Sequence, residues 1–327
     1  MLKVGIVSLA HVHARSYAEL LSGRPDVELR ILEQDASLRS DVSDLTVCMS
    51  RAEDFWGWAP DAVIITSETV HHLRDVLAAA AAGAHILCEK PIATTRADAR
   101  AIVEACGRAG VGLMMAFPVG FSPEAEIMRS AVEDGALGEV ISAIGVNTGK
   151  LPATRDWFAD PEMSGGGAIV DHVVHIAELL DRLGLRAESV SAATTNVLQQ
   201  ERLRPGVESG ALVTISYESG VTASIDASWS EPDGSPLWGG LSLEIVGSAA
   251  NLAINPFGRT VNGMGGSGPV AFGYGPDLDD LMISAFLASV RGSRDFTPGG
   301  DVGLRTLAIV HAAQESARTG QPASVVA

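Results

Sequence analysis

Residues 61–94 of this 327-residue chain read DAVIITSETVHHLRDVLAAAAAGAHILCEKPIAT. The apolar run at 61–66 is bounded by polar residues, which is typical of a strand buried on both faces. Residues 72–82 have the alanine- and leucine-rich composition of a helix, and a glycine follows at the usual capping position. Residues 85–88 form a second apolar strand that ends at Glu89-Lys90-Pro91. A strand, a helix and a strand over this length predict a right-handed βαβ unit.

The same alternation extends along the first third of the chain on both sides of this unit. Strand-like runs lie at residues 2–7, 27–32 and 111–117, and helical patterns lie at 13–21 and 95–109. Repeated alternation of this kind predicts a parallel sheet with helices on its faces, the Rossmann type of α/β fold.

Polar residues that follow the predicted strands mark one candidate crevice. In open parallel sheets, ligands bind beyond the carboxyl ends of the strands. Residues 8–11, 67–71 and 89–91 all follow such ends, so we expect them to line a common binding site.

The pattern changes after about residue 121. A helix is predicted at 123–134, a strand at 138–146, and a long helix at 168–183 after a glycine turn. Strands joined by short turns follow and indicate an antiparallel sheet, and two helices close the chain. The expected strands lie at 189–197, 211–217, 221–229, 241–246 and 250–254, the closing helices at 278–291 and 302–319, and a flexible loop at 263–268.

The fold class is therefore α/β with two domains. We expect a Rossmann domain at residues 1–121. Residues 122–327 are expected to form an α+β domain with a large, mainly antiparallel open sheet.

Composition excludes several classes of protein. The formal charge of −17 disfavours a nucleic-acid partner, because phosphate binding needs a positive surface. No apolar run approaches the length of a membrane span. Three cysteines without C-x-x-C spacing, and an N-terminus that leads straight into a strand, indicate a cytoplasmic protein without a signal peptide.

Four stretches resemble the glucose–fructose oxidoreductase / inositol dehydrogenase / rhizopine catabolism (Gfo/Idh/MocA) family. They are residues 61–71, residues 87–94 with the Glu-Lys-Pro motif, residues 165–175 with the glycine turn and Asp-x-x-x-His, and the tail at 285–320. Their order along nearly the whole chain is that of the family.

The resemblance implies an NAD(P)-dependent oxidoreductase that acts on a secondary alcohol of a sugar, cyclitol or related polyol. Lys90, Asp171 and His175 match the family's catalytic residues. A histidine suits the proton transfer because its ordinary pKa lies near neutrality. Asp171, four residues earlier on the expected helix, can orient the imidazole, and Lys90 can stabilise negative charge on the substrate oxygen.

The cofactor motif departs from its usual form. The first loop normally reads G-x-G-x-x-G/A, so that the backbone can approach the pyrophosphate. Ser8 and Ala10 replace the two leading glycines here. The acidic Glu33 favours NAD, because a carboxylate repels the 2′-phosphate of NADP. NADP is kept as the alternative cofactor. The predicted cofactor contacts are Ser8, Ala10, His11, Glu33, Thr66, Ser67, His71, Glu89 and Lys90.

Substrate contacts are expected in the second domain and at Lys90. They are Lys90, Arg155, Trp157, Asp171, His172 and His175. No motif supplies a clear third metal ligand beside the histidines, so no metal is predicted.

Two other functions stay open at this point. One is an enzyme of the same family that retains its NAD and uses transient oxidation for glycoside cleavage or elimination. The other is a non-catalytic, ligand-sensing regulator on the same scaffold. The expected partners are a small sugar or polyol and other copies of the chain, in a homodimer or homotetramer formed through the second domain's sheet.

Overall fold

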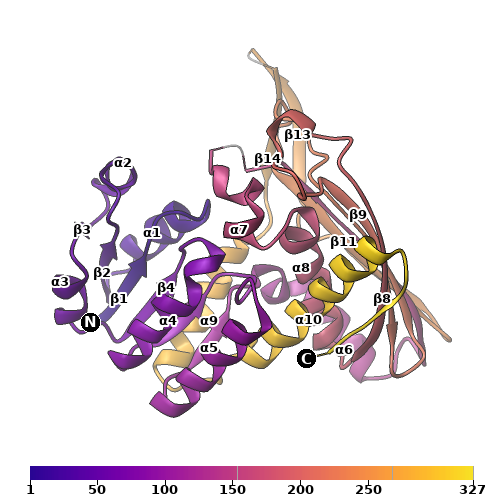
Figure 1. Ribbon diagram of the computed structural model, residues 1–327, viewed down its shortest axis with the longest axis horizontal. Helices are drawn as coiled ribbons and strands as arrows, with labels where there is room; N and C mark the ends of the chain where they lie inside the picture. Colours follow the sequence, from indigo (N-terminus) through magenta and orange to yellow (C-terminus); the bar gives the residue numbers. More distant parts are fainter. Residues whose placement is uncertain (153, 267, 327) are drawn as a thin grey trace. The chain divides into compact units, whose positions relative to one another are not determined.

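The computed structural model describes residues 1–152, 154–266 and 268–326. The chain divides into two compact units (Figure 1). The first unit contains Met1–Phe117 and Asp279–Leu304, and the second contains Pro118–Leu278 and Arg305–Ala327. A late segment of the chain thus belongs with the N-terminal sheet, whereas the sequence analysis assigned everything after residue 121 to the second domain.

Hydrogen bonds hold this late segment in the first unit. Met115 N–H donates to the Pro298 carbonyl oxygen at 2.8 Å, which extends the last strand of the sheet. Arg24 donates to Ser284 Oγ at 2.8 Å. These contacts lie far apart in sequence and can be formed only in the folded chain.

A six-stranded parallel sheet forms the core of the first unit. The strand order is β3-β2-β1-β4-β5-β6, the arrangement of a doubly wound dinucleotide-binding fold. Its strands are β1 (Leu2–Val7), β2 (Val27–Leu32), β3 (Val47–Met49), β4 (Ala62–Ile65), β5 (His85–Cys88) and β6 (Leu113–Met115). Its helices include α1 (Ala14–Ser22), α2 (Ala36–Arg39), α3 (Ala52–Gly57), α4 (His72–Ala81), α5 (Arg96–Ala109) and most of α9 (Leu278–Val290). The predicted Rossmann sheet is confirmed.

The sequence analysis did not identify β3 or α3. Both are short, and their composition is too mixed to show a period of two or of 3.6 residues. They are held by tertiary packing: Phe55 of α3 is fully buried, and a Cβ at Gly5 of β1 would lie 2.4 Å from its ring. The absence of a side chain at Gly5 therefore lets α3 pack against the sheet.

A seven-stranded sheet dominates the second unit. The strand order is β12-β11-β7-β10-β9-β8-β15, and every pair is antiparallel except β7 with β10. The predicted large, mainly antiparallel open sheet is confirmed. Its strands are β7 (Val140–Gly149), β8 (Ala187–Thr195), β9 (Gly210–Tyr217), β10 (Thr222–Ser228), β11 (Gly239–Gly247), β12 (Asn251–Ile254) and β15 (Ala323–Ser324).

Helices cover one face of this sheet. Figure 1 shows α8 (Val174–Arg182) and α10 (Gly300–Thr319) on the same side of it. A Cβ at Gly145 of β7 would lie 2.8 Å from Ile176 Cγ2, so the glycine permits close approach of α8. The unit also contains α6 (Pro123–Glu133) and the short α7 (Pro161–Ser164).

The helix predicted at 168–183 is not a regular α-helix throughout. Its first turn is the π-helical segment η5 (Ile169–Val173), and α8 follows from Val174. A π turn widens the helix locally and often occurs at functional sites. Asp171 lies within this wider turn, so the simple i, i+4 geometry assumed for it does not apply unchanged.

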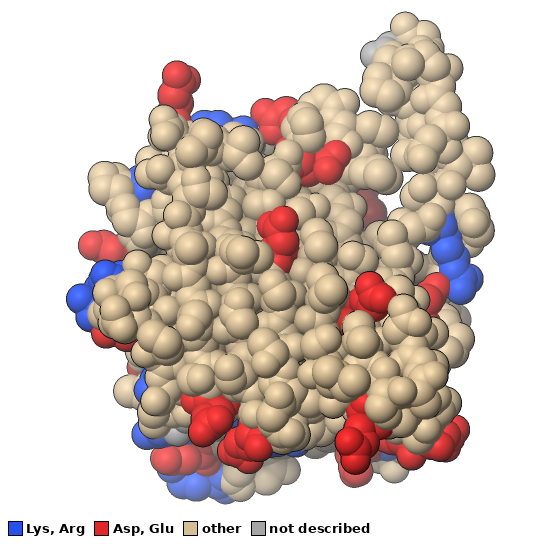
Figure 2. All heavy atoms as spheres, turned by 90° about the vertical axis from the view of Figure 1, so that its right-hand side faces the viewer, with Lys and Arg blue, Asp and Glu red and all other residues tan. Residues whose placement is uncertain are grey.

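The other face of the seven-stranded sheet carries exposed apolar side chains. Ile144 of β7 and Leu212 of β9 are about half exposed, at 52% and 56%. Figure 2 shows the side of the molecule on which this face lies, with mostly uncharged side chains and separate acidic ones.

Residues 263–265 and 268 of the glycine-rich stretch predicted as a flexible loop lie instead in two strands, and Ser267 lies outside the described residues. Strands β13 (Thr260–Gly265) and β14 (Gly268–Gly273) pair with each other in antiparallel register. The prediction failed because a glycine-rich composition hides the strand pattern, whereas backbone hydrogen bonds do not depend on side chains.

Candidate functional site

The carboxyl ends of three adjacent strands stop in one row. Val7 of β1 pairs with Ile65 of β4, and Ile65 pairs with Cys88 of β5. The next residues, Ser8, Thr66 and Glu89, therefore start at the same edge of the sheet. On the other side of β1, Val7 pairs with Leu32, which brings Glu33 to this edge as well. The sheet register brings together four of the predicted cofactor contacts.

Glu33 holds the first loop by hydrogen bonds. Its Oε2 accepts from Leu9 N–H at 2.6 Å and lies 3.3 Å from Ser8 Oγ. Its Oε1 accepts from Asp35 N–H at 2.8 Å. A carboxylate has about four acceptor positions, so these contacts leave room for a further hydroxyl group.

Ser8 has a left-handed backbone conformation with φ of 71°. This conformation is the one that a glycine normally supplies at the start of the phosphate loop, because a β-carbon is strained there. The Ser8 hydroxyl compensates in part, since it accepts from Ala10 N–H at 3.2 Å. Thr66 Oγ1 donates to the Ser8 carbonyl oxygen at 2.6 Å. The loop thus takes a left-handed backbone conformation at Ser8 without a glycine.

Glu89 is buried and is surrounded by proton-bearing side chains, of which His13 is one-third exposed. Tyr17 Oη donates to Glu89 Oε1 at 2.7 Å, and His13 Nδ1 lies 3.3 Å from the same oxygen. His11 Nδ1 is 3.5 Å from it. Burial alone would raise the pKa of Glu89, but the histidines and Lys90 lower it well below its usual range. Burial opposes protonation of His13, yet contact with Glu89 outweighs it and raises the pKa of His13.

His72, rather than His71, joins two of the loops. Its Nδ1 lies 3.0 Å from the Pro91 carbonyl oxygen and its Nε2 lies 3.2 Å from the Ser67 carbonyl oxygen. His72 is buried, and desolvation lowers its pKa, whereas His71 is half-buried in a short 3-10 turn. Lys90 is buried beside this group and is followed by a cis peptide bond to Pro91.

In the second unit, a buried tryptophan orients Asp171. Trp229 is fully buried, and its Nε1–H donates to Asp171 Oδ2 at 2.9 Å. The same oxygen lies 3.6 Å from His172 Nε2. Asn147 Nδ2 donates to the His172 carbonyl oxygen at 3.0 Å. His175 is half-buried one turn later, on α8. Because Trp229 is fully buried, the position of its ring is fixed, and its N–H holds the Asp171 carboxylate in place.

Glu208 and Gly167 fix the start of this helix. Glu208 Oε1 accepts from Gly167 N–H at 3.1 Å and from Ile169 N–H at 2.9 Å. A Cβ at Gly167 would lie 2.1 Å from the Glu208 carbonyl oxygen, so only glycine fits there. Burial raises the pKa of Glu208, although these backbone donors oppose the shift. The glycine turn therefore positions Asp171 through backbone hydrogen bonds.

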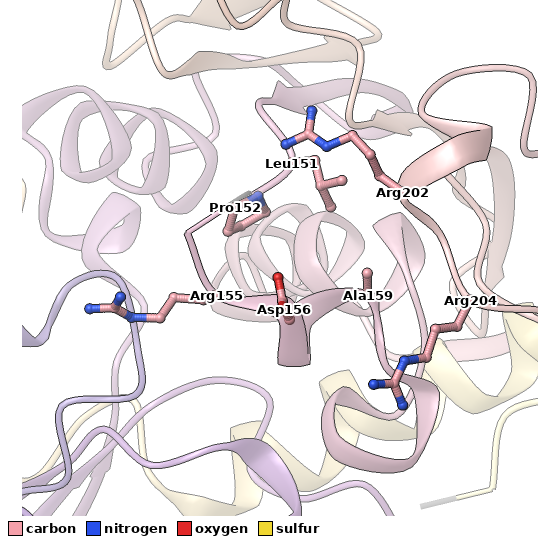
Figure 3. Close-up of a pocket in the computed structure, with 7 residues that line it drawn as sticks. All are labelled: Leu151, Pro152, Arg155, Asp156, Ala159, Arg202 and Arg204. Carbon is pink, nitrogen blue, oxygen red and sulfur yellow. The ribbon is translucent and has the colours of Figure 1, made fainter. Parts of the chain in front are cut away.

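A cavity of about 270 Å³ lies in the same unit (Figure 3). Its lining residues are Leu151, Pro152, Arg155, Asp156, Ala159, Arg202 and Arg204. Figure 3 shows the Arg155 side chain extending away from the other lining residues, whereas Arg202 and Arg204 extend toward them. Arg202 pairs with Asp233, and Arg204 pairs with Asp160.

One buried apolar cluster connects the cavity with Trp229, the tryptophan that contacts Asp171. Leu151 and Ala159, which line the cavity, pack in a buried cluster with Trp229. Trp157 stacks on Phe158, with ring centroids 4.0 Å apart. Of the predicted substrate contacts, Arg155 lines the cavity, and Trp157 packs against the buried ring of Phe158.

Several contacts within these sites had no signal in the sequence. Tyr17, His13 and Glu89 come together only because α1 follows the loop that faces β5. Trp229 and Asn147 contact Asp171 and His172 from two strands that lie far from them along the chain. No spacing rule links such positions, and only the sheet register does.

Family models match both parts of the chain. Residues 30–117 match the oxidoreductase family with an NAD-binding Rossmann fold, and residues 126–253 match the GFO/IDH/MocA C-terminal domain. The chain belongs to the GFO/IDH/MocA family. It is an NAD-binding oxidoreductase, as the resemblance predicted.

Curated relatives match most of the chain. A 1,5-anhydro-D-fructose reductase of Ensifer adhaerens is 30% identical, over 81% of this chain and 80% of its own length. A D-apiose dehydrogenase of Paraburkholderia graminis is 28% identical, over 80% of this chain and 72% of its own.

None of the helices among the described residues is long and apolar enough to span a membrane.

Solved structures share the fold. GenD2 from gentamicin A biosynthesis, solved in complex with NAD, has a TM-score of 0.87 at 21% identity and covers 100% of this chain and 97% of its own. A myo-inositol 2-dehydrogenase from Lactobacillus plantarum has a TM-score of 0.85 at 20% identity, over 99% of both chains.

The loop residues fit a bound dinucleotide. Helix α1 follows the loop, and its N-terminus has neither a side-chain cap nor an acidic residue in its first turn. Such a terminus favours an anion. Ser67 Oγ is buried at the same edge and has no hydrogen-bond partner among the described residues. The left-handed Ser8 lies at the start of this loop.

The strain at Ser8 can be measured with two variants. Ser8→Ala keeps the β-carbon at positive φ, whereas Ser8→Gly removes it, and both lose the hydroxyl contacts. We expect Ser8→Gly to be more stable than Ser8→Ala by about 1 kcal/mol in urea unfolding. Ser130, inside α6, is the matched control, and there the alanine variant should be the more stable one. Equal stability of the two Ser8 variants would contradict the left-handed conformation.

Proposed function

We propose that this protein is an NAD-dependent dehydrogenase for a secondary alcohol of a sugar, cyclitol or related polyol. The observation that carries the proposal is the row of Ser8, Glu33, Thr66 and Glu89 at the carboxyl edge of a parallel sheet. The family model that matches this part of the chain describes an NAD-binding Rossmann fold.

Cofactor binding is assigned to the first unit. The predicted contacts stay as proposed: Ser8, Ala10, His11, Glu33, Thr66, Ser67, His71, Glu89 and Lys90. Backbone N–H groups of the first loop and of α1 would face the pyrophosphate. Glu33, at the end of β2, would accept from the adenosine ribose hydroxyls and repel a 2′-phosphate. When bound, NAD supplies the hydride acceptor of the reaction.

His175 is proposed to take the hydroxyl proton at a ring nitrogen. Oxidation of an alcohol releases that proton, and a histidine can accept it near neutral pH. Asp171 would stabilise the resulting positive charge and limit the orientations of the imidazole. This role is supported by the contact with the buried Trp229, whose Nε1–H donates to Asp171 Oδ2 at 2.9 Å.

Lys90 is proposed to donate a hydrogen bond from Nζ to the substrate oxygen. Its ammonium group would stabilise the negative charge that develops there as the proton leaves. Lysine suits this role better than arginine because its charge is concentrated on one small group. Only three lysines occur in the chain, at positions 3, 90 and 150.

The substrate class is proposed from the relatives and from the second unit. The relatives named above act on 1,5-anhydro-D-fructose and D-apiose according to their names. Arg155, Trp157 and His172 are proposed substrate contacts beside Lys90, Asp171 and His175. The cavity that Arg155 lines supports a polar ligand, because it combines charged side chains with an apolar floor.

A homodimer or homotetramer is proposed through the open face of the seven-stranded sheet. Ile144 and Leu212 support it, because exposed apolar side chains on a sheet face favour association. A cytoplasmic location is proposed as well. It is supported by Cys48, Cys88 and Cys106, which are free thiols.

Cofactor preference tests the first part of the proposal. Titration of the purified protein with NADH and NADPH, followed by tryptophan quenching, should give saturable binding that is at least about 10-fold tighter for NADH. Glu33→Gln removes the repelling charge and should narrow this difference. Absence of binding by either cofactor at millimolar concentration would overturn the dehydrogenase assignment.

The catalytic residues are tested by steady-state kinetics on a panel that includes 1,5-anhydro-D-fructose with NADH, and D-apiose and myo-inositol with NAD. His175→Asn should lower kcat by about 10²- to 10⁴-fold, because general-base catalysis is lost. Asp171→Asn and Lys90→Met should also lower kcat, with NADH affinity of the His175 and Asp171 variants unchanged. Lys150→Met is the matched lysine control and should retain kcat. Product formation without net cofactor reduction would instead favour the NAD-retaining reaction.

Oligomer formation is tested by light scattering after gel filtration. Leu212 lies opposite Asp226 on the neighbouring strand. In the monomer, the lysine of Leu212→Lys can pair with Asp226, whereas burial of this charge in an apolar interface between subunits would be costly. We expect it to shift the protein toward monomer. Ile127→Lys, on exposed α6, is the control and should leave the mass unchanged. A monomeric wild-type protein would contradict the proposal.

A further inference from the structure

Three side chains with metal-ligand chemistry gather at the carboxyl edge of the first unit. They are His11 and His13 of the first loop and Glu89 at the end of β5. One potential ligand atom from each residue lies within 4.8 Å of the others. The sequence indicated no such group, because Glu89 is 76 residues from His13.

The spacing of these atoms is that of a coordination sphere. His11 Nδ1 is 3.5 Å and His13 Nδ1 is 3.3 Å from Glu89 Oε1. For zinc, with bonds to nitrogen and oxygen of about 2.0–2.2 Å, neighbouring ligands in a tetrahedron are about 3.4 Å apart. Each imidazole nitrogen is therefore at the distance from the Glu89 oxygen that a shared bound ion would require, and the two imidazoles lie within 4.8 Å of each other.

The surroundings suit a built site rather than a chance surface cluster. His11 and Glu89 are 2% and 1% exposed. Tyr17 Oη donates to Glu89 Oε1, and Lys90 N–H donates to Glu89 Oε2 at 3.1 Å. Hydrogen bonds of this kind orient ligating carboxylates in metal sites. Asp279 adds negative charge near His13, while the Lys90 ammonium group opposes it.

We propose that His11, His13 and Glu89 bind a divalent transition-metal ion, with zinc as the preferred one. Two neutral imidazoles and one carboxylate are a common ligand set for zinc with one position left for water or another ligand. Magnesium and calcium are disfavoured, because they prefer oxygen ligands only. The site does not depend on the proposed dehydrogenase activity, and metal binding is measured without any substrate.

Cobalt titration of the full-length protein tests the site. Protein stripped with a chelator is titrated with Co²⁺ and followed by visible absorption, which reports coordination of low symmetry. We expect a band that saturates at about one Co²⁺ per chain and that Zn²⁺ displaces. The same stripped protein should gain thermal stability when Zn²⁺ is added, because a ligand of the native state stabilises it. Absence of a saturating cobalt band in the wild-type protein overturns the proposal.

Three variants assign the ligands. His11→Ala, His13→Ala and Glu89→Gln should each weaken cobalt binding at least about 100-fold. His71→Ala is the matched control, because it removes another histidine of the same sheet edge and should leave the band intact. A wild-type band that persists in all three ligand variants would show that the ion binds elsewhere, and a protonated imidazole beside Glu89 would then account for the cluster.

Discussion

Parallel register in the first unit is the constraint on which the sites of this unit depend. Strands β1, β4 and β5 end at Val7, Ile65 and Cys88, and these three residues pair in one row. Because the backbone hydrogen bonds set this alignment, the polar residues that follow are brought to one edge whatever their distance along the chain. A shift of the register would separate Ser8, Thr66 and Glu89 and would disrupt both the loop and the histidine cluster at once.

The second unit positions its polar residues by a different means. Asp171 is directed by Trp229 Nε1, and Trp229 belongs to a buried apolar cluster. The glycine turn is held by Glu208, whose side chain accepts from two backbone N–H groups. A buried carboxylate is costly unless it is hydrogen-bonded, so these donors explain how the unit keeps acids inside. Packing of the core and orientation of Asp171 are thus linked through a single tryptophan.

The first loop shows how a familiar shape can be made with unusual residues. The left-handed conformation of Ser8 is strained for any residue with a β-carbon. Hydrogen bonds from the loop to Glu33, and from Thr66 to the Ser8 carbonyl oxygen, offset that strain. The histidines that follow bring imidazoles to a place where many dinucleotide-binding loops have only backbone. The charge of Glu89 is then balanced by side chains rather than by water.

The sequence by itself determined the alternation of strands and helices, the Rossmann class of the first unit, the open sheet of the second and the family. These features depend on local periodicity and on motifs such as Glu89-Lys90-Pro91, which are visible in a linear chain. Only the tertiary structure decided that residues 279–304 return to the first unit, that Asp171 lies in a π turn, and that Glu89 meets His11 and His13. These features depend on contacts between segments that are distant in sequence, and such contacts arise from sheet register and core packing, which leave no periodic trace in the residues themselves.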